Sequence, residues 1–267
     1  MTQESSPQLA GSQWLIALLF ALSLVTFVVF LSLWQITASG AGSHLLSRSV
    51  AETADLDSAL PDIESALGDA VKQSAEDPLT IPNFPITVQI TRDEAIGTTS
   101  EDLYARILNT SGDAIYNDGV AVWDDTDPDA SQAIARGSTA GAVRLGVGFI
   151  GNTQHVIFFA LAGIAGLATL VFAFALTVQM SALRRLVTLG TVAAGSAVPA
   201  FIVALLVGVL LPTLGSGAYS DSMLDIAVDA ESVAVRNFVI VSLLGLAVAV
   251  TGLTSASLQA RSHSEGL

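Results

Sequence analysis

The densest group of potential ligands in this chain is the acidic stretch Asp124-Asp125-Thr126-Asp127-Pro128-Asp129. Clustered carboxylates can bind Ca²⁺, but the calcium loop of an EF-hand needs glycine at its sixth position and a bidentate glutamate at its twelfth. A loop that starts at Asp125 has Ala130 and Arg136 at these two positions. We therefore expect a solvated acidic loop here and no metal site.

Few other residues could carry out catalysis. The chain has no cysteine, and His44, His155 and His263 lack the spacing of metal ligands. The sequence has no nucleophile elbow and no acid–base pair in the context that a catalytic site requires. We therefore expect that the protein is not an enzyme, has no catalytic residues and binds no cofactor.

One motif for covalent modification is present. Asn109-Thr110-Ser111 matches the acceptor sequence for N-glycosylation. Together with the following Gly112 and Asp113, it has the composition of a turn. We expect Asn109 to be a possible glycosylation site on an exposed turn outside the membrane.

Four long runs without a charged residue determine the architecture. A helix needs about 20 apolar residues to cross a bilayer, and each run is long enough. The apolar fraction of 52% and the mean hydropathy of +0.64 also indicate an integral membrane protein. The runs are Trp14–Trp34, Val156–Val178, Leu186–Leu211 and Phe238–Ala256. Because none contains an ionisable residue, they lack the groups with which pumps and proton-coupled carriers move charge.

Small residues recur at helical spacing within three of these runs. In lipid, helices associate by close approach of their backbones, which small residues permit. The candidate packing residues are Ala162 and Gly166 in the second run, Ala200, Ala204 and Gly208 in the third, and Gly245 and Ala249 in the fourth. These contacts could form within the chain or with a partner.

The distribution of arginine predicts the orientation of the helices in the membrane. Short cytoplasmic segments carry an excess of Lys and Arg. Arg184, Arg185 and Arg261 lie on the side of the predicted bundle that also holds the termini, against Arg236 alone in the second loop of the opposite side. We expect a multi-pass protein of the cell membrane with both termini in the cytoplasm and the large domain outside.

These signals divide the chain into nine segments. In order, they are a cytoplasmic tail (1–13), a transmembrane helix (14–36), an extracytoplasmic domain (37–153), a transmembrane helix (154–178), a cytoplasmic loop (179–185), a transmembrane helix (186–211), an acidic outer loop (212–237), a transmembrane helix (238–258) and a cytoplasmic tail (259–267). The first run could instead be a cleaved signal peptide. We favour an uncleaved span, because the run is longer than an h-region and no positive charge precedes it.

Most of the negative charge lies between the first and second runs. Residues 37–155 hold eighteen acidic and six basic residues, and Lys72 is the only lysine of the chain. This composition resembles that of membrane proteins from halophilic archaea, because dense carboxylates repel one another little in molar salt. An acidic outer domain of a GC-rich bacterium is the alternative. The sequence has no basic stripe to neutralise phosphates, so we expect no binding of nucleic acid.

The domain between these two runs is predicted to contain helices followed by a sheet. Residues 44–76 have the period of an amphipathic helix, with a joint at Leu60. The period then changes to two, which is typical of half-buried strands. The expected strands are Ile86–Ile90, Leu103–Leu108, Ala114–Tyr116, Val120–Trp123 and Ala142–Ile150. The predicted fold is therefore an α+β membrane protein: a four-helix transmembrane bundle with an extracytoplasmic domain of helices and an antiparallel sheet.

Two segments of this domain carry a resemblance to a known family. Residues 106–116, Arg-Ile-Leu-Asn-Thr-Ser-Gly-Asp-Ala-Ile-Tyr, resemble the strand–turn–strand of extracytoplasmic PAS-like (Cache-type) sensor domains of membrane receptors. Residues 141–147, Gly-Ala-Val-Arg-Leu-Gly-Val, are similar to the strand by which such domains return to the membrane. The resemblance implies a sensor, although no ligand-binding signature matches. The chain also has no kinase, HAMP or methyl-accepting region after its second span.

These observations favour a non-enzymatic integral membrane protein with an outer sensing or binding domain. We expect it to act in the lipid bilayer through a membrane-protein partner or as a homo-oligomer. The alternative is a subunit of an ABC-type permease or of another membrane complex with a large first outer loop. Such permeases need a cytoplasmic coupling helix, for which residues 179–185 are too few.

Overall fold

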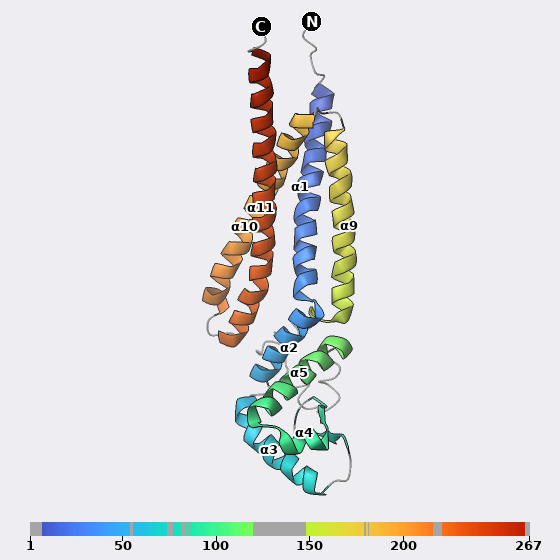
Figure 1. Cartoon of the computed structure of the whole chain (residues 1–267), viewed down its shortest axis with the longest axis vertical. Coiled ribbons are helices and arrows are strands. Elements are labelled where there is room, and N and C mark those ends of the chain that lie inside the picture. Colours follow the sequence, from blue (N-terminus) through green and yellow to red (C-terminus); the bar gives the residue numbers. More distant parts are fainter. Residues whose placement is uncertain are drawn as a thin grey trace. The chain divides into compact units, whose positions relative to one another are not determined.

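The computed structural model describes residues 7–53, 56–73, 77–81, 84, 86–119, 148–178, 180, 182–215 and 221–264. These residues form helices and one small sheet (Figure 1). The chain divides into two compact units. We call residues 1–34, 156–211 and 228–267 the span unit, and residues 35–155 and 212–227 the loop domain.

Four long helices carry the apolar runs. They are α1 (Pro7–Ile36), α9 (Asn152–Thr177), α10 (Ala182–Gly215) and α11 (Asp221–Ser264). Each contains a stretch that is long and apolar enough to cross a membrane: Gln13–Ile36, Asn152–Thr177, Leu183–Leu210 and Ala227–Leu258. The prediction of four helices that are long and apolar enough to cross a membrane is confirmed, as expected of a multi-pass membrane protein.

The fourth helix starts well before the predicted boundary. α11 begins at Asp221, so residues 221–237 are helical rather than a connecting loop. The acidic residues of this segment explain the difference, because carboxylates are favourable near the positive end of a helix dipole. As a consequence, the fourth candidate span includes Glu231 and Arg236, whereas the predicted span started at Phe238 and had no ionisable residue.

Within the span unit, α1 lies beside α9, and α10 pairs with α11 (Figure 1). A cluster of the buried residues Val28, Ala197 and Phe238 joins α1, α10 and α11. On its other side, α1 contacts α9 through Trp34 and Phe159, whose ring centroids lie 5.6 Å apart. The start of α1 and the end of α11 lie at the same end of this unit (Figure 1), as an even number of crossings requires.

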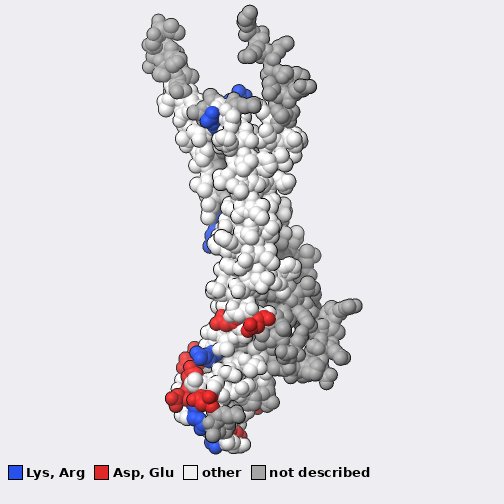
Figure 2. Space-filling view, turned by 90° about the vertical axis from the view of Figure 1, so that its right-hand side faces the viewer, with Lys and Arg blue, Asp and Glu red and all other residues white. Residues whose placement is uncertain are grey.

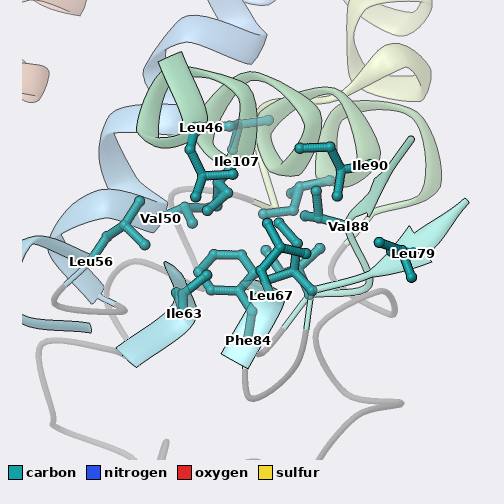
Figure 3. Packing of buried hydrophobic residues seen from close by; sticks show 14 of the residues in the cluster. Leu46, Val50, Leu56, Ile63, Leu67, Leu79, Phe84, Val88, Ile90 and Ile107 are labelled. Atoms are coloured by element: carbon teal, nitrogen blue, oxygen red, sulfur yellow. The ribbon is translucent and has the colours of Figure 1, made fainter. Parts of the chain in front are cut away.

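In the part of the loop domain that the structure describes, four helices surround one hydrophobic core. The helices are α2 (Ser39–Thr53), α3 (Leu56–Gln73), α4 (Arg92–Gly97) and α5 (Ser100–Asp118). Figure 3 shows apolar side chains from the helices and from the segment 79–90 converging on this core. Its members include Leu46, Val50, Leu56, Ile63, Leu67, Phe84, Val88, Ile90 and Ile107.

The predicted helical segment 44–76 corresponds to α2 and α3. The predicted face is present, since Leu56, Ile63 and Leu67 are buried on α3. The predicted joint at Leu60 is wrong, because α3 continues through Pro61. Pro61 is the sixth residue of α3, so it removes the hydrogen bond to the carbonyl of Asp57, and the helix continues past it without that bond.

Two of the five predicted strands are wrong. Residues 100–118 form the helix α5, which excludes the predicted strands Leu103–Leu108 and Ala114–Tyr116 and the turn between them. The sheet that the structure describes has only two strands, β1 (Leu79–Thr80) and β2 (Gln89–Ile90), which pair antiparallel with Leu79 opposite Ile90. The predicted strand Ile86–Ile90 is therefore confirmed only at its end.

Capping residues explain why this segment is helical. The side chain of Thr99 accepts a hydrogen bond from the backbone N–H of Asp102, which starts α5. Gly119, with a φ of 78°, ends it. Between these caps, Leu103, Ile107, Ser111 and Ile115 recur every four residues, and all four are buried. This spacing belongs to one face of a helix and overrides the local preference of residues 109–113 for a turn.

Several predicted elements lie outside the described residues. They are the strand Val120–Trp123, residues 142–147 of the strand Ala142–Ile150, the acidic stretch 124–129 and the segment 141–147 of the receptor resemblance. The other segment of that resemblance, residues 106–116, is part of α5. The strand–turn–strand on which the resemblance to PAS-like domains rested is therefore absent from residues 106–116.

Charged side chains gather on the loop domain. Figure 2 shows acidic and basic residues over this domain, whereas the described part of the spans is almost uncharged on the same face. The ion pair between Arg106 and Glu94, at 3.2 Å, is exposed and contributes little to stability. Hydrogen bonds from the side chain and backbone of Thr91, followed by the nearby Arg106, lower the pKa of Glu94 below its ordinary value.

Candidate functional site

The features of this structure that can support function are surfaces where helices meet. Among the described residues, no group of three or more His, Cys, Asp or Glu side chains could hold a metal ion. His44 is exposed on α2, and His155 is half-buried in the first turn of α9. The side chain of His263 lies outside the described part of the chain. The described side chains do not bring two histidines together at one site.

The closest helix contact in the span unit is the antiparallel pair of α10 and α11, which we call the α10–α11 seam. A Cβ atom on Gly190 would lie 2.5 Å from the carbonyl oxygen of Gly245 and would also clash with the backbone nitrogen of Ala249. A Cβ atom on Gly245 would lie 2.7 Å from the backbone nitrogen of Ala194. The two backbones are therefore in direct contact, as helices in lipid can be only where both have small residues.

The α10–α11 seam follows a heptad pattern on both helices. Its contacts repeat at steps of three and four residues, which is the geometry of left-handed helix pairs. On α10 they include Val187, Gly190, Ala194, Ala197, Ala204 and Gly208; on α11 they include Glu231, Phe238, Gly245, Ala249 and Gly252. Four of the seven predicted packing residues lie in it: Ala204, Gly208, Gly245 and Ala249. Gly190 was not among the predicted residues, although Ala194 follows it at the spacing of one helical turn.

The remaining predicted packing residues contact α1 or its neighbours. Gly166 of α9 lies against Phe27 of α1, because a Cβ atom there would be 3.2 Å from the phenyl ring. Ala162 is buried on the same helix, one turn away. Ala200 of α10 packs against the cluster of Val28, Ala197 and Phe238. Gly166 and Ala200 therefore lie against other helices of the span unit.

A polar bridge between α1 and α11 lies inside the span unit. The side-chain amide of Asn237 donates a hydrogen bond of 2.9 Å to the hydroxyl oxygen of Ser32, and Ser32 donates one of 2.8 Å to the carbonyl of Val28. Both side chains are buried. Hydrogen bonds between helices hold membrane bundles together, and each contributes about 1 kcal/mol. Sequence analysis missed this bridge, because both residues are uncharged and 205 positions separate them.

An apolar groove of about 390 Å³ lies between α1 and α9. Phe27, Leu31 and Trp34 line it from α1, and Phe159, Gly163 and Gly166 are among the residues that line it from α9. Apart from the indole N–H of Trp34, the lining side chains carry no polar group. The groove therefore has no acid or base with which it could transfer a proton.

In the loop domain, α2 and α5 cross with their backbones close together. A Cβ atom on Gly112 would lie 2.5 Å from the carbonyl oxygen of Ser43 and would clash with the hydroxyl of Ser47. The Ser47 hydroxyl lies 2.8 Å from the carbonyl oxygens of both Ser43 and Leu108, so it bridges the two helices. This contact fixes α5 on α2 at one point.

A second contact fixes α5 beside the start of α2. The ring of Tyr116 lies against Gly42, and its hydroxyl donates a hydrogen bond of 2.9 Å to the carbonyl of Thr37. Thr37 and Ala38 are the only residues between α1, which ends at Ile36, and α2, which begins at Ser39. The end of α5 is therefore tied to the joint that connects the first span with the loop domain.

The candidate glycosylation site lies on α5. Asn109 is exposed, but it belongs to a helix rather than to the predicted turn. Ser111, the third residue of the motif, is fully buried between the helices. Its hydroxyl has no hydrogen-bond partner among the described residues. The folded domain therefore presents the asparagine without the serine that an enzyme must also recognise.

Comparison with known proteins adds no functional assignment. No family model, no curated protein and no solved structure matches this chain. Its function must therefore be argued from the helix contacts themselves.

Replacing Tyr116 by phenylalanine tests the contact at the joint. Loss of the hydroxyl leaves the buried carbonyl of Thr37 without this donor, and we expect the free energy of unfolding to fall by about 1 kcal/mol. Burial also raises the pKa of Tyr116 above its ordinary value of 10.0. Ionisation is therefore disfavoured in the folded state, and wild-type stability should fall as the pH rises above 10.0.

Hydrogen exchange of the full-length protein in detergent can measure both effects. Amides of α2 and α5 should exchange faster in Tyr116→Phe at neutral pH, and the variant should lose less additional protection at high pH than wild type. The pKa of Tyr104 is raised as well, by burial and by the neighbouring Asp57, so part of the alkaline effect should remain. Identical exchange in wild type and variant would show that the hydrogen bond contributes nothing.

Proposed function

We propose that this protein is a non-enzymatic integral membrane protein that binds or senses a factor with its loop domain and acts through a membrane-protein partner. The observation that carries the proposal is the joint at Thr37. Its carbonyl accepts the hydrogen bond of Tyr116, and only two residues separate α1 from α2. A shift of α5 relative to α2 would therefore act directly on the end of the first span.

Low burial of the spans supports the need for a partner. In the most apolar windows of the four spans, only 17%, 17%, 11% and 22% of the residues are buried. Most of their surface is left for lipid or for another membrane protein. Gly163 and Gly195 are exposed, and a Cβ atom at either would meet no other atom within 4 Å. Gly163 borders the groove beside α1, and both glycines offer small-residue surfaces on which another helix could pack.

The alternative, a subunit of an ABC-type permease, is less well supported. Force from an ATPase reaches such subunits through a cytoplasmic helix between spans. Here α9 ends at Thr177 and α10 begins at Ala182, so only four residues connect them, which is about one helical turn and too few for a separate coupling helix. We therefore retain the sensing function as the proposal.

Photo-crosslinking in native membranes can distinguish these functions. A photoreactive residue can replace Gly163 on α9 in one variant and Gly195 on α10 in a second, matched variant. Both positions have space for a larger side chain. We expect at least one site to capture a membrane protein with a cytoplasmic signalling domain. Capture of an ATP-hydrolysing transport subunit would contradict the sensing function, and capture of lipid alone at both sites would contradict action through a partner.

A further inference from the structure

One ionisable side chain lies in the α10–α11 seam. Glu231 of α11 packs against Gly208 of α10: a Cβ atom on Gly208 would be 2.6 Å from Oε2 and 2.8 Å from Cδ of the carboxyl group. Any residue larger than glycine would displace this carboxyl group. Gly208 therefore provides the space that Glu231 occupies.

The carboxyl group of Glu231 is incompletely hydrogen-bonded. Its Oε1 atom is buried and has no partner among the described residues. An ionised carboxylate with a buried, unpaired oxygen loses its solvation without compensation, which strongly disfavours the charged form. Within a membrane span the cost is of similar size or larger. A neutral, protonated carboxyl group avoids most of this cost.

The surroundings of Glu231 offer little to compensate a negative charge. The facing helix α10 has no ionisable residue between Leu186 and Leu211, and α1 has none between Trp14 and Trp34. On α11 itself, the charged neighbours are Asp229 and Arg236, and both are exposed. Asp229 adds negative charge nearby, and Arg236 is five residues away, which does not share a helix face with Glu231.

The position of Glu231 along the helix allows exchange of protons with water. It lies within the candidate span Ala227–Leu258, seven residues before the apolar run that starts at Phe238. At 1.5 Å per residue this is about 10 Å along the axis, near one boundary of the apolar layer. At the other end of the seam, Gly190 and Gly245 hold the helices together by backbone contact.

We propose that Glu231 is a proton-binding site: it is protonated while it packs against Gly208, and loss of the proton separates this end of the α10–α11 seam. A charge at Glu231 would leave Oε1 without water unless the two helices move apart at Gly208. The contacts around Gly190 do not depend on this proton. Proton binding is thereby coupled to the spacing of two membrane helices.

Infrared spectroscopy of the full-length protein in lipid tests the protonation directly. Wild type near neutral pH should show the carbonyl stretching band of a protonated carboxyl group, and Glu231→Gln should lack it. Asp229→Asn removes a neighbouring exposed carboxylate and is the matched control, which should keep the band. Absence of the band in wild type, or its persistence in Glu231→Gln, would overturn the proposal.

Spin-label distances test the coupling to helix spacing. Because the chain has no cysteine, labels can be placed at the exposed residues Val209 and Ser232 near Glu231, and at Thr191 and Thr251 near the other end. Raising the pH should lengthen the first distance in wild type, leave it short in Glu231→Gln, and leave the second distance unchanged. The coupling would be refuted if the distance between the labels at Val209 and Ser232 did not change with pH, or if it lengthened equally in Glu231→Gln.

Discussion

Replacing Gly190 by leucine is expected to lower the free energy of unfolding of the span unit by about 3 kcal/mol, at the upper end of the cost of overpacking. A side chain at this position meets backbone atoms of Gly245 and Ala249, which cannot rotate away. The helices must then separate along the seam and lose the packing that holds them in lipid. Unfolding of the purified protein in mixed micelles with a denaturing detergent would measure the change.

The matched control for this substitution lies on the same helix. Gly195 is exposed, and a Cβ atom there meets no other atom within 4 Å, so Gly195→Leu adds the same side chain on a free surface. We expect a change below about 0.5 kcal/mol, as for other substitutions at free surfaces. Equal destabilisation by the two leucines would contradict the close contact of α10 and α11.

Replacing Gly112 by alanine is expected to destabilise the loop domain by about 2 kcal/mol, although alanine is the better helix former. The added methyl group would lie 2.5 Å from the carbonyl oxygen of Ser43, and the side chain of Ser47 would also have to move. The bridge from Ser47 to the carbonyl of Leu108 would be lost with it. Thermal unfolding followed by hydrogen exchange in α2 and α5 would report the loss.

The same substitution at Gly68 should have the opposite sign. Gly68 lies inside α3, and a Cβ atom there would meet no other atom within 4 Å. Alanine therefore brings only its higher helix propensity, which is worth about 0.5–1 kcal/mol. A stabilised Gly68→Ala beside a destabilised Gly112→Ala would support the crossing of α2 and α5; two stabilised variants would contradict it.

The membrane part of the fold could be predicted well from the sequence, because it depends on composition over long windows. Length and hydropathy alone identify the four spans, and small residues at four-residue spacing identify Gly208, Gly245 and Ala249 as packing residues. The loop domain could not be predicted equally well. Residues 103–108 alone suit a strand as well as a helix. The caps at Thr99 and Gly119, and the four-residue spacing that continues from Ile107 to Ile115, distinguish the two.

The candidate sites were harder to predict than the helices. The bridge between Ser32 and Asn237 joins residues far apart in the chain, and no spacing rule links them. Glu231 was predicted to lie in the outer loop 212–237, because the predicted fourth span began only at Phe238. The helix that contains the fourth apolar run starts upstream of Phe238, because α11 begins at Asp221. Glu231 and Asn237 therefore lie on the same helix as the fourth candidate span.

We propose that four helices cross the membrane, with both termini in the cytoplasm and the loop domain outside. Labelling of single cysteines in intact cells with a membrane-impermeant thiol reagent tests it most directly. Asn109 is suitable because it is exposed on α5, whereas the neighbouring Ser111 is buried. We expect Asn109→Cys to react in intact cells and Ser264→Cys, near the end of the chain, to react only after permeabilisation. Protection of Asn109→Cys together with labelling of Ser264→Cys, or equal labelling of both, would contradict the account.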